Sequence, residues 1–171
     1  VLGEAMAHWP RCDEIVVTDK CTKFRMKNPG DLRRNLEHQL WRMRREWFDF
    51  YLFHGIGWAN WHEIDERTGW IKDMLRAKEE GLVRHIGFSF HDEPENMLRL
   101  IDEGLFELVT CQYNYLDRRN EQAMAYAKDK GLQPFAQLRD GLEPVSPAEH
   151  RQRQGQRAQP GIGHEGLFVF V

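Results

Sequence analysis

Hydrophobic and polar residues alternate along the chain in a pattern that predicts four β-strands. Aromatic residues dominate the run Trp47–His54 (WFDFYLFH), as is typical of strands. Apolar side chains occupy both faces of this run, which indicates a parallel sheet that is covered on both sides. The other three predicted strands are Glu14–Cys21, Val83–Phe90 and Phe106–Tyr113.

Between these runs, apolar residues recur at the three-to-four-residue spacing of amphipathic helices. One such stripe runs from Leu32 to Met43. Its helix is predicted to start at Asn28-Pro29, with Asn as the cap and Pro at the first helical position. Further helices are predicted over residues 1–7, over residues 65–80, from Asp92 to about Leu105 and over residues 120–130.

The segment from Gly55 to about Glu63 is predicted to be a loop that follows the second strand. It carries Trp58 and Trp61. Two interpretations are open: the tryptophans pack over the end of the sheet, or they form one wall of a substrate pocket, since loops at that end of a parallel sheet carry function.

The strict alternation of strands and helices predicts an α/β fold with a parallel sheet. Periodicity alone does not separate an open doubly wound sheet from a (β/α)8 barrel. No GxGxxG follows the first strand and no GxxxxGK[ST] is present, which argues against a dinucleotide-binding Rossmann unit and a P-loop. An intact flavodoxin-like domain is a weaker alternative, because its phosphate-binding loop is not evident.

The composition narrows the class of protein. The chain has 171 residues, 41% hydrophobic and 30% charged, which suits one globular domain. The net charge of −3 gives no electrostatic reason to expect nucleic acid or a membrane as a partner. Cys12, Cys21 and Cys111 form no CxxC, so we expect reduced thiols in a cytoplasmic protein and no metal site.

Each predicted strand ends in a hydrogen-bonding side chain: Lys20, His54, Ser89 and Gln112, in chain order. Taken singly, these residues have plain explanations, namely a surface lysine, a core histidine, a turn serine and a satisfied amide. The carboxyl ends of parallel strands meet at one edge of the sheet, and α/β folds bind ligands there. Together the four residues therefore predict a site.

Four blocks of the sequence, VVTDKCTK, FDFYLFHG, EEGLVRHIGFSFH and LVTCQYNYLDR, resemble successive blocks of the aldo-keto reductases. The most similar branch is the bacterial and archaeal one that often carries a C-terminal iron–sulfur domain. The resemblance covers residues 1–131 and implies parallel (β/α) units of an incomplete (β/α)8 TIM barrel. The activity that it implies is the reduction of carbonyls with NADPH. It also implies that Lys20 and His54 are the lysine and histidine of the catalytic tetrad, and that Ser89 and Gln112 bind the nicotinamide carboxamide.

This chemistry requires those residue types. Hydride passes from the nicotinamide to a carbonyl carbon, and negative charge develops on the carbonyl oxygen. By the resemblance, a tyrosine supplies the proton, and the Lys20 ammonium favours its phenolate form. His54 hydrogen-bonds the carbonyl oxygen and orients it.

The chain also departs from the family. The aspartate and tyrosine of the tetrad belong to a segment before Val1, and the asparagine that usually follows the serine is Phe90 here. We therefore expect a fragment of an NADPH-dependent reductase of small carbonyl substrates that is inactive alone. The alternative is a non-catalytic barrel fragment that acts only through association with other proteins. The sequence does not predict the oligomeric state.

The resemblance stops after Leu132, where the composition shifts to Gln, Arg, Pro and Gly. Such a composition favours disorder, so residues 132–171 are predicted to form a divergent, disordered tail, appended out of frame as a hypothesis. Residues from about Pro144 to His164 are expected to lack regular structure. The apolar end, Leu167–Val171, is expected to aggregate or to pair with an exposed sheet edge.

Overall fold

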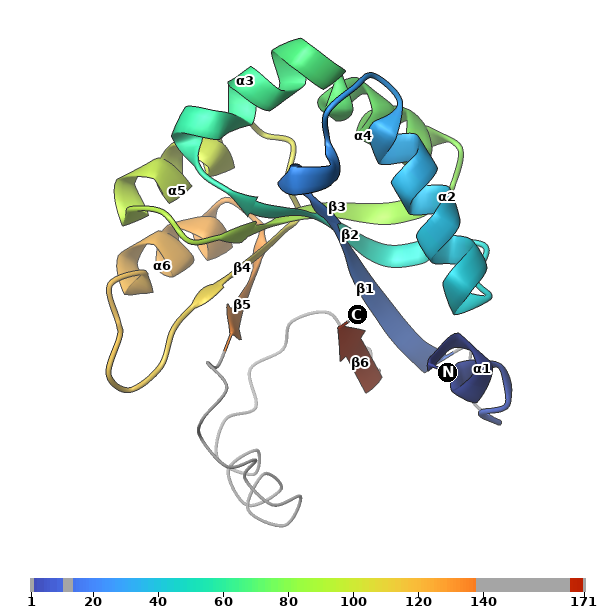
Figure 1. Ribbon diagram of the computed structural model, residues 1–171. Helices are drawn as coiled ribbons and strands as arrows, with labels where there is room; N and C mark the ends of the chain where they lie inside the picture. The colour runs from blue at the N-terminus through green and yellow to red at the C-terminus, as the bar shows by residue number, and fades with distance from the viewer. Residues whose placement is uncertain (1, 11–13, 138–166, 171) are drawn as a thin grey trace.

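The computed structural model describes residues 2–10, 14–137 and 167–170. Helices α2 to α6 lie on the convex side of one curved sheet (Figure 1). The elements in chain order are α1 (Leu2–Ala7), β1 (Ile15–Thr22), η2 (Lys23–Arg25), α2 (Asp31–Met43), β2 (Phe48–Ile56), α3 (Trp58–Thr68), α4 (Trp70–Glu79), β3 (Val83–Phe90), α5 (Pro94–Asp102), β4 (Leu108–Gln112), α6 (Glu121–Asp129), β5 (Gln133–Gln137) and β6 (Leu167–Phe170).

The sheet has the strand order β5-β4-β3-β2-β1-β6, and every pair of neighbours is parallel. The four predicted strands are confirmed in their order and direction. Strand β5, which the sequence did not predict, tolerates Pro134 because it is an edge strand of the described sheet. Strand β6 pairs with Ile15–Thr18 of β1, which is one of the two outcomes expected for the apolar end of the chain. The segment Pro144–His164 lies outside the described residues.

The predicted start of α2 at Asn28-Pro29 is wrong, because the helix begins at Asp31 behind Gly30, whose φ is 79°. The Asp31 carboxylate accepts hydrogen bonds from the backbone N–H of Lys27, at 2.9 Å, and of Asn28, at 2.7 Å. These bonds hold the preceding residues in a turn, so the helix starts two residues after the proline.

The loop predicted from Gly55 to Glu63 is also wrong, since α3 begins at Trp58. The Asn60 side-chain oxygen accepts the Gly57 N–H at 3.2 Å and caps this helix. The single helix predicted over residues 65–80 is two helices, which meet at Gly69. Its φ of 65° lies in the left-handed region, which interrupts a right-handed helix and favours glycine.

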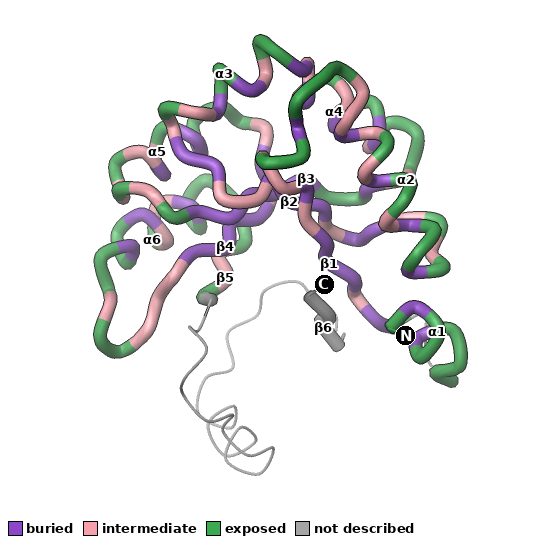
Figure 2. The backbone as a smooth tube through the Cα atoms, viewed as in Figure 1, coloured by how far each residue is buried: buried purple, intermediate pink, exposed green. Residues whose placement is uncertain are grey.

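The helices cover the outer face of the sheet through an aromatic cluster around Phe53. The Phe53 ring centroid lies 5.0 Å from that of Trp61 and 4.7 Å from that of Trp70, and both tryptophans are fully buried. In Figure 2 the central strands are mostly coloured as buried, and the helices that cover them alternate between buried and exposed residues. Trp61 therefore packs in the core, as the first of the two interpretations expected, and it does not face a pocket.

On the inner face of the sheet, three residues of adjacent strands pack side by side. They are Leu52 of β2, Gly87 of β3 and Leu108 of β4. A Cβ atom on Gly87 would lie 2.5 Å from Leu52 Cδ2 and 2.7 Å from the Leu108 carbonyl oxygen. Only glycine therefore fits between these two leucines. Residues two positions further along each strand form the next layer, towards the carboxyl ends.

Gly87→Ala is expected to destabilise the fold by about 1–3 kcal/mol, the typical cost of overpacking a core. The added methyl group meets a backbone oxygen that cannot move without disturbing β4. Urea unfolding measures the effect, with the exposed Glu79→Ala on α4 as the control. A Gly87→Ala protein as stable as this control would contradict the close approach of the strands.

Candidate functional site

Lys20 and His54 lie near the carboxyl ends of the adjacent strands β1 and β2. Lys20 pairs with Leu52, and His54 pairs with Thr22, so both project from the inner face of the sheet. Both are half-buried, and both line a cavity of about 930 Å³. Most of the wall of this cavity comes from α1, α2 and the two residues that follow α2, with Thr22 and Arg25 near Lys20. The structure thus brings together the two residues that the sequence singled out first.

The two side chains also interact electrostatically. Burial lowers the pKa of His54, and the nearby positive charge of Lys20 lowers it further. Burial lowers the pKa of Lys20 too, while the neighbouring Asp19 carboxylate opposes that shift. At neutral pH the imidazole is therefore uncharged and able to donate or accept one hydrogen bond at each nitrogen, depending on its tautomer.

Asp19 is a residue of this region that the sequence analysis missed. It is 5% exposed, lines the same cavity and accepts the Lys20 N–H at 2.7 Å through Oδ1. Burial raises the pKa of Asp19 from its usual 3.8 to about 6. A carboxylate within the apolar run of a strand was the available signal, because such a group is buried at a cost.

Ser89 and Gln112 lie at the ends of β3 and β4 but do not line this cavity. Ser89 is fully buried, and its Oγ accepts the backbone N–H of Gly55 at 2.8 Å. Gly55 directly follows His54, so Ser89 holds the turn from which the histidine emerges. Gln112 is half-buried, and its main-chain carbonyl accepts Asn120 Nδ2 at 3.0 Å.

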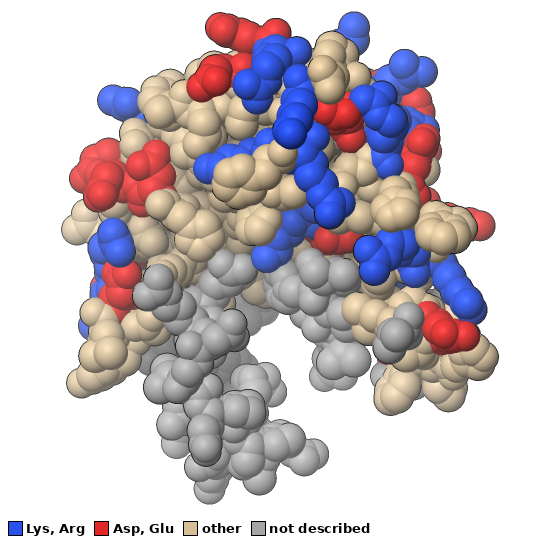
Figure 3. Space-filling model, viewed as in Figure 1, with Lys and Arg blue, Asp and Glu red and all other residues tan. Residues whose placement is uncertain are grey.

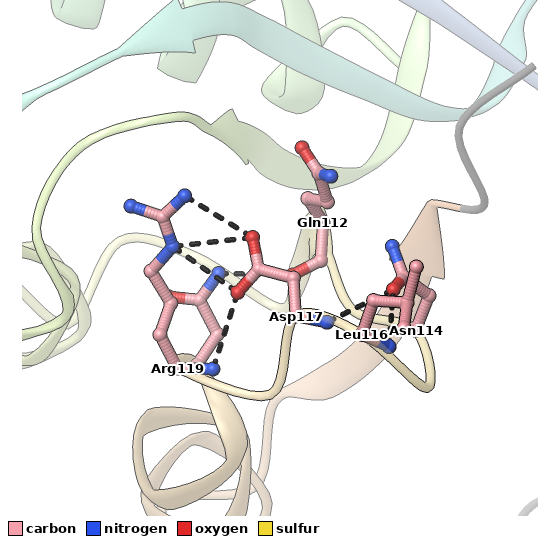
Figure 4. Close-up of polar contacts among 6 residues, drawn as sticks. Gln112, Asn114, Leu116, Asp117 and Arg119 are labelled. Atoms are coloured by element: carbon pink, nitrogen blue, oxygen red, sulfur yellow. Dashed lines mark hydrogen bonds and ion pairs between the residues drawn. The ribbon is translucent and has the colours of Figure 1, made fainter.

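A turn held by its own side chains follows β4. Asn114 Oδ1 accepts the N–H groups of Leu116, at 2.8 Å, and of Asp117, at 2.9 Å, and Asp117 is paired with Arg119 at 3.1 Å. Figure 4 shows the Gln112 amide pointing away from this turn.

Positive charge surrounds the cavity. Lys and Arg side chains gather over η2 and α2 on the face shown in Figure 3. The basic residues that line the cavity are Lys20, Arg25, Arg42, Arg44 and Arg45, and its acidic residues are Glu4 and Asp19. Such a surround favours an anionic ligand over a cationic one.

In the described part of the chain, no three His, Cys, Asp or Glu side chains are placed to hold a metal ion. Cys21 and Cys111 are buried free thiols. None of the described helices combines the length and the apolar character needed to cross a membrane.

The family model for the aldo/keto reductase family matches residues 1–138. The chain belongs to the aldo/keto reductase family. The match ends six residues after Leu132, where the sequence blocks stop resembling the family. It therefore includes strand β5. No curated protein sequence matches the chain.

Solved structures similar to the chain are aldo-keto reductases. A putative enzyme from Pseudomonas aeruginosa has a TM-score of 0.63 at 22% identity over 78% of this chain and 52% of its own. An enzyme from Klebsiella pneumoniae in complex with NADP and acetate has a TM-score of 0.64 at 23% identity, over 90% and 56% of the two chains. The likeness confirms the predicted fold class, parallel (β/α) units of an incomplete (β/α)8 barrel. The chain spans about half the length of these proteins.

Ser89→Ala is expected to destabilise the fold by about 1–3 kcal/mol, because it leaves the partly buried Gly55 N–H without its acceptor. Thr110→Val is the matched control on the neighbouring strand. Thr110 is also buried, but within the described residues its hydroxyl has no hydrogen-bond partner, so the isosteric valine should cost nothing. Chemical denaturation compares the two variants, and equal losses of stability would contradict the assigned role of Ser89.

Asp19→Asn is expected to stabilise the protein in a pH-dependent way. The native pKa of Asp19, about 6, lies above the ordinary 3.8, so the native state favours the protonated form. The stability that Asp19 contributes is complete below pH 4 and is lost as the pH rises through 6.

Asparagine keeps an oxygen for the Lys20 N–H and does not ionise. The difference in unfolding free energy between Asp19→Asn and the parent should be smallest at pH 4 and reach about 3 kcal/mol above pH 6. Denaturation curves from pH 4 to 8 measure it. A constant difference across this range would show that Asp19 ionises normally.

Proposed function

We propose that this chain supplies the lysine and histidine of a site that reduces small aldehydes or ketones with NADPH. The observation that carries the proposal is that Lys20 and His54, near the carboxyl ends of adjacent parallel strands in an aldo/keto reductase chain, both line one cavity. Ligands bind at that end of a (β/α)8 barrel.

The residues at the ends of β3 and β4 fit a nicotinamide carboxamide. The Ser89 hydroxyl accepts one hydrogen bond and keeps its own proton to donate, and its register partner Thr110 has a buried hydroxyl with no partner among the described residues. The Gln112 amide adds both a donor and an acceptor. NADPH, when bound, supplies the hydride, and these three side chains would hold its carboxamide.

His54 and Lys20 have separate tasks in this proposal. His54 is uncharged at neutral pH and donates a hydrogen bond to the carbonyl oxygen, which fixes the orientation of the substrate. The Lys20 ammonium stabilises the negative charge that develops on that oxygen and favours the ionised form of a neighbouring proton donor. The surrounding arginines suit a substrate that carries a negative charge.

None of the four tyrosines lines the cavity. Tyr51 lies on the outer face of β2, and burial raises its pKa well above the usual value, which is the opposite of what a phenolate-forming donor requires. This supports the expectation that the chain alone turns over slowly. It also favours the alternative, a barrel fragment that acts through protein association. Membership of the branch with an iron–sulfur domain and a cytoplasmic location are further proposals from the sequence.

Cofactor binding is tested by titrating the ¹⁵N-labelled chain with NADPH up to millimolar concentration. The amides of Gly55, Ser89 and Gln112 are expected to shift, because the carboxamide lies against them. Gln112→Ala should weaken the binding, and Glu79→Ala on the far side of α4 should leave it unchanged. An absence of shifts at these three amides, with the fold intact, would reject the cofactor assignment.

Turnover is measured separately as NADPH oxidation with a reactive aldehyde. A missing general acid typically lowers a rate by ~10²–10⁴-fold, so the chain alone should be slow. His54→Ala and Lys20→Met should then change little. Rapid turnover that either substitution abolishes would show that a further proton donor exists and would reject the expected inactivity.

A further inference from the structure

Lys20 lies in the part of β1 that no longer pairs with the edge strand β6. The pairing of β6 with β1 extends from Ile15 to Thr18, and Lys20 lies two residues beyond it. Its carbonyl oxygen accepts a hydrogen bond from Gln39 Nε2 at 3.0 Å, across 19 residues of sequence. A side chain of α2 therefore holds the main chain of β1 at the point from which Lys20 enters the cavity.

Gln39 belongs to a hydrogen-bond network with Asn35 and Tyr51. Its Oε1 accepts Asn35 Nδ2 at 2.7 Å and also accepts the Tyr51 hydroxyl. The Tyr51 oxygen in turn accepts Asn35 Nδ2 at 3.0 Å. Two donors thus point at Oε1, so the amide of Gln39 has one orientation, with Nε2 towards the Lys20 carbonyl.

The network is anchored in the core. Tyr51 is 0% exposed and stacks against Phe48, with ring centroids 5.7 Å apart. Asn35 and Gln39 lie one turn apart on α2, so they reach the tyrosine from the same side of the helix. At the other end, Arg25 Nη1 donates to Asn35 Oδ1 at 3.2 Å. The Gln39 amide is therefore tied to the core through a fully buried ring.

We propose that Gln39 is a positioning residue for Lys20, which it holds in the cavity by binding its main-chain carbonyl from a network anchored on Tyr51. The importance of Lys20 rests on the proposed function, but the positioning itself does not. Gln39 touches the backbone of Lys20, not its ammonium group, so it acts on the site through the path of the strand.

The test uses Gln39→Met, which keeps the length of the side chain but removes the donor. Glu37→Met is the matched control, since it places the same residue on the same helix at an exposed position whose partner is Arg33. The pKa of Lys20 is followed by NMR of its side chain without cofactor or substrate, and amide exchange is followed at Lys20 and Cys21. A failure of NADPH to bind therefore has no bearing on this result.

In Gln39→Met, Lys20 should move towards solvent and its pKa should rise towards that of an ordinary lysine, because burial lowers it in the parent. Exchange at the two amides should become about fivefold faster, the factor that one net hydrogen bond is typically worth. Glu37→Met should match the parent in both measurements. An unchanged Lys20 pKa in a folded Gln39→Met protein would overturn the proposal.

Tyr51→Phe provides a second route if Gln39→Met does not fold. It preserves the buried ring and removes one of the two donors that orient the Gln39 amide, so the pKa of Lys20 should rise in the same direction by a smaller amount. An unchanged pKa in Tyr51→Phe, when Gln39→Met is unfolded, would also overturn the proposal.

Discussion

The structure depends on the packing of Phe53 against two tryptophans on the outer face of the sheet. Trp61 comes from α3 and Trp70 from α4, so this single side chain holds both helices against β2. Successive residues of a strand point to opposite faces. The anchoring of Phe53 outwards therefore directs the next residue, His54, inwards, and the core determines where the candidate site is built.

The side chains of β1 are divided between the two faces in the same way. Val17 and Cys21 are buried on the helix side, while Lys20 and Thr22 project from the inner face. Asp19 is the exception, because it places a carboxylate among residues of the helix side. Its Oδ1 accepts the Lys20 N–H, while Gln39 binds the Lys20 carbonyl. The two main-chain polar groups of one residue are thus bound by side chains from different elements.

Much of the fold could be predicted from the sequence, because periodicity reports burial directly. The four strands and the helices over residues 94–102 and 121–129 lie where their apolar patterns indicated. The wrong predictions concern the ends of helices, which local hydrogen bonds and backbone conformation decide. The carboxylate of Asp31 delays the start of α2, and the backbone of Gly69 divides one predicted helix into two. Such contacts leave no mark on the spacing of apolar residues.

The candidate site was predictable only in part. Lys20 and His54 were visible as polar ends of apolar strands, and the structure places them in one cavity. Gln39 could not be found in this way, because it lies between the leucines of an amphipathic helix and looks like a boundary residue. Its role appears only when β1 and α2 are seen together. A polar residue that acts on the backbone of another element gives no sequence signal of its own.

The strand order has a consequence for how the chain folds. From β1 to β5, every strand pairs with its neighbour in sequence, so each contact closes a short loop. The pairing of Ile15 with Leu167 is different, since nearly the whole chain separates the two residues. Closing a longer loop costs more entropy, and contacts between distant residues slow folding. We therefore expect the five consecutive strands to assemble first and the edge strand β6 to dock last, onto a β1 that its other neighbours have already ordered.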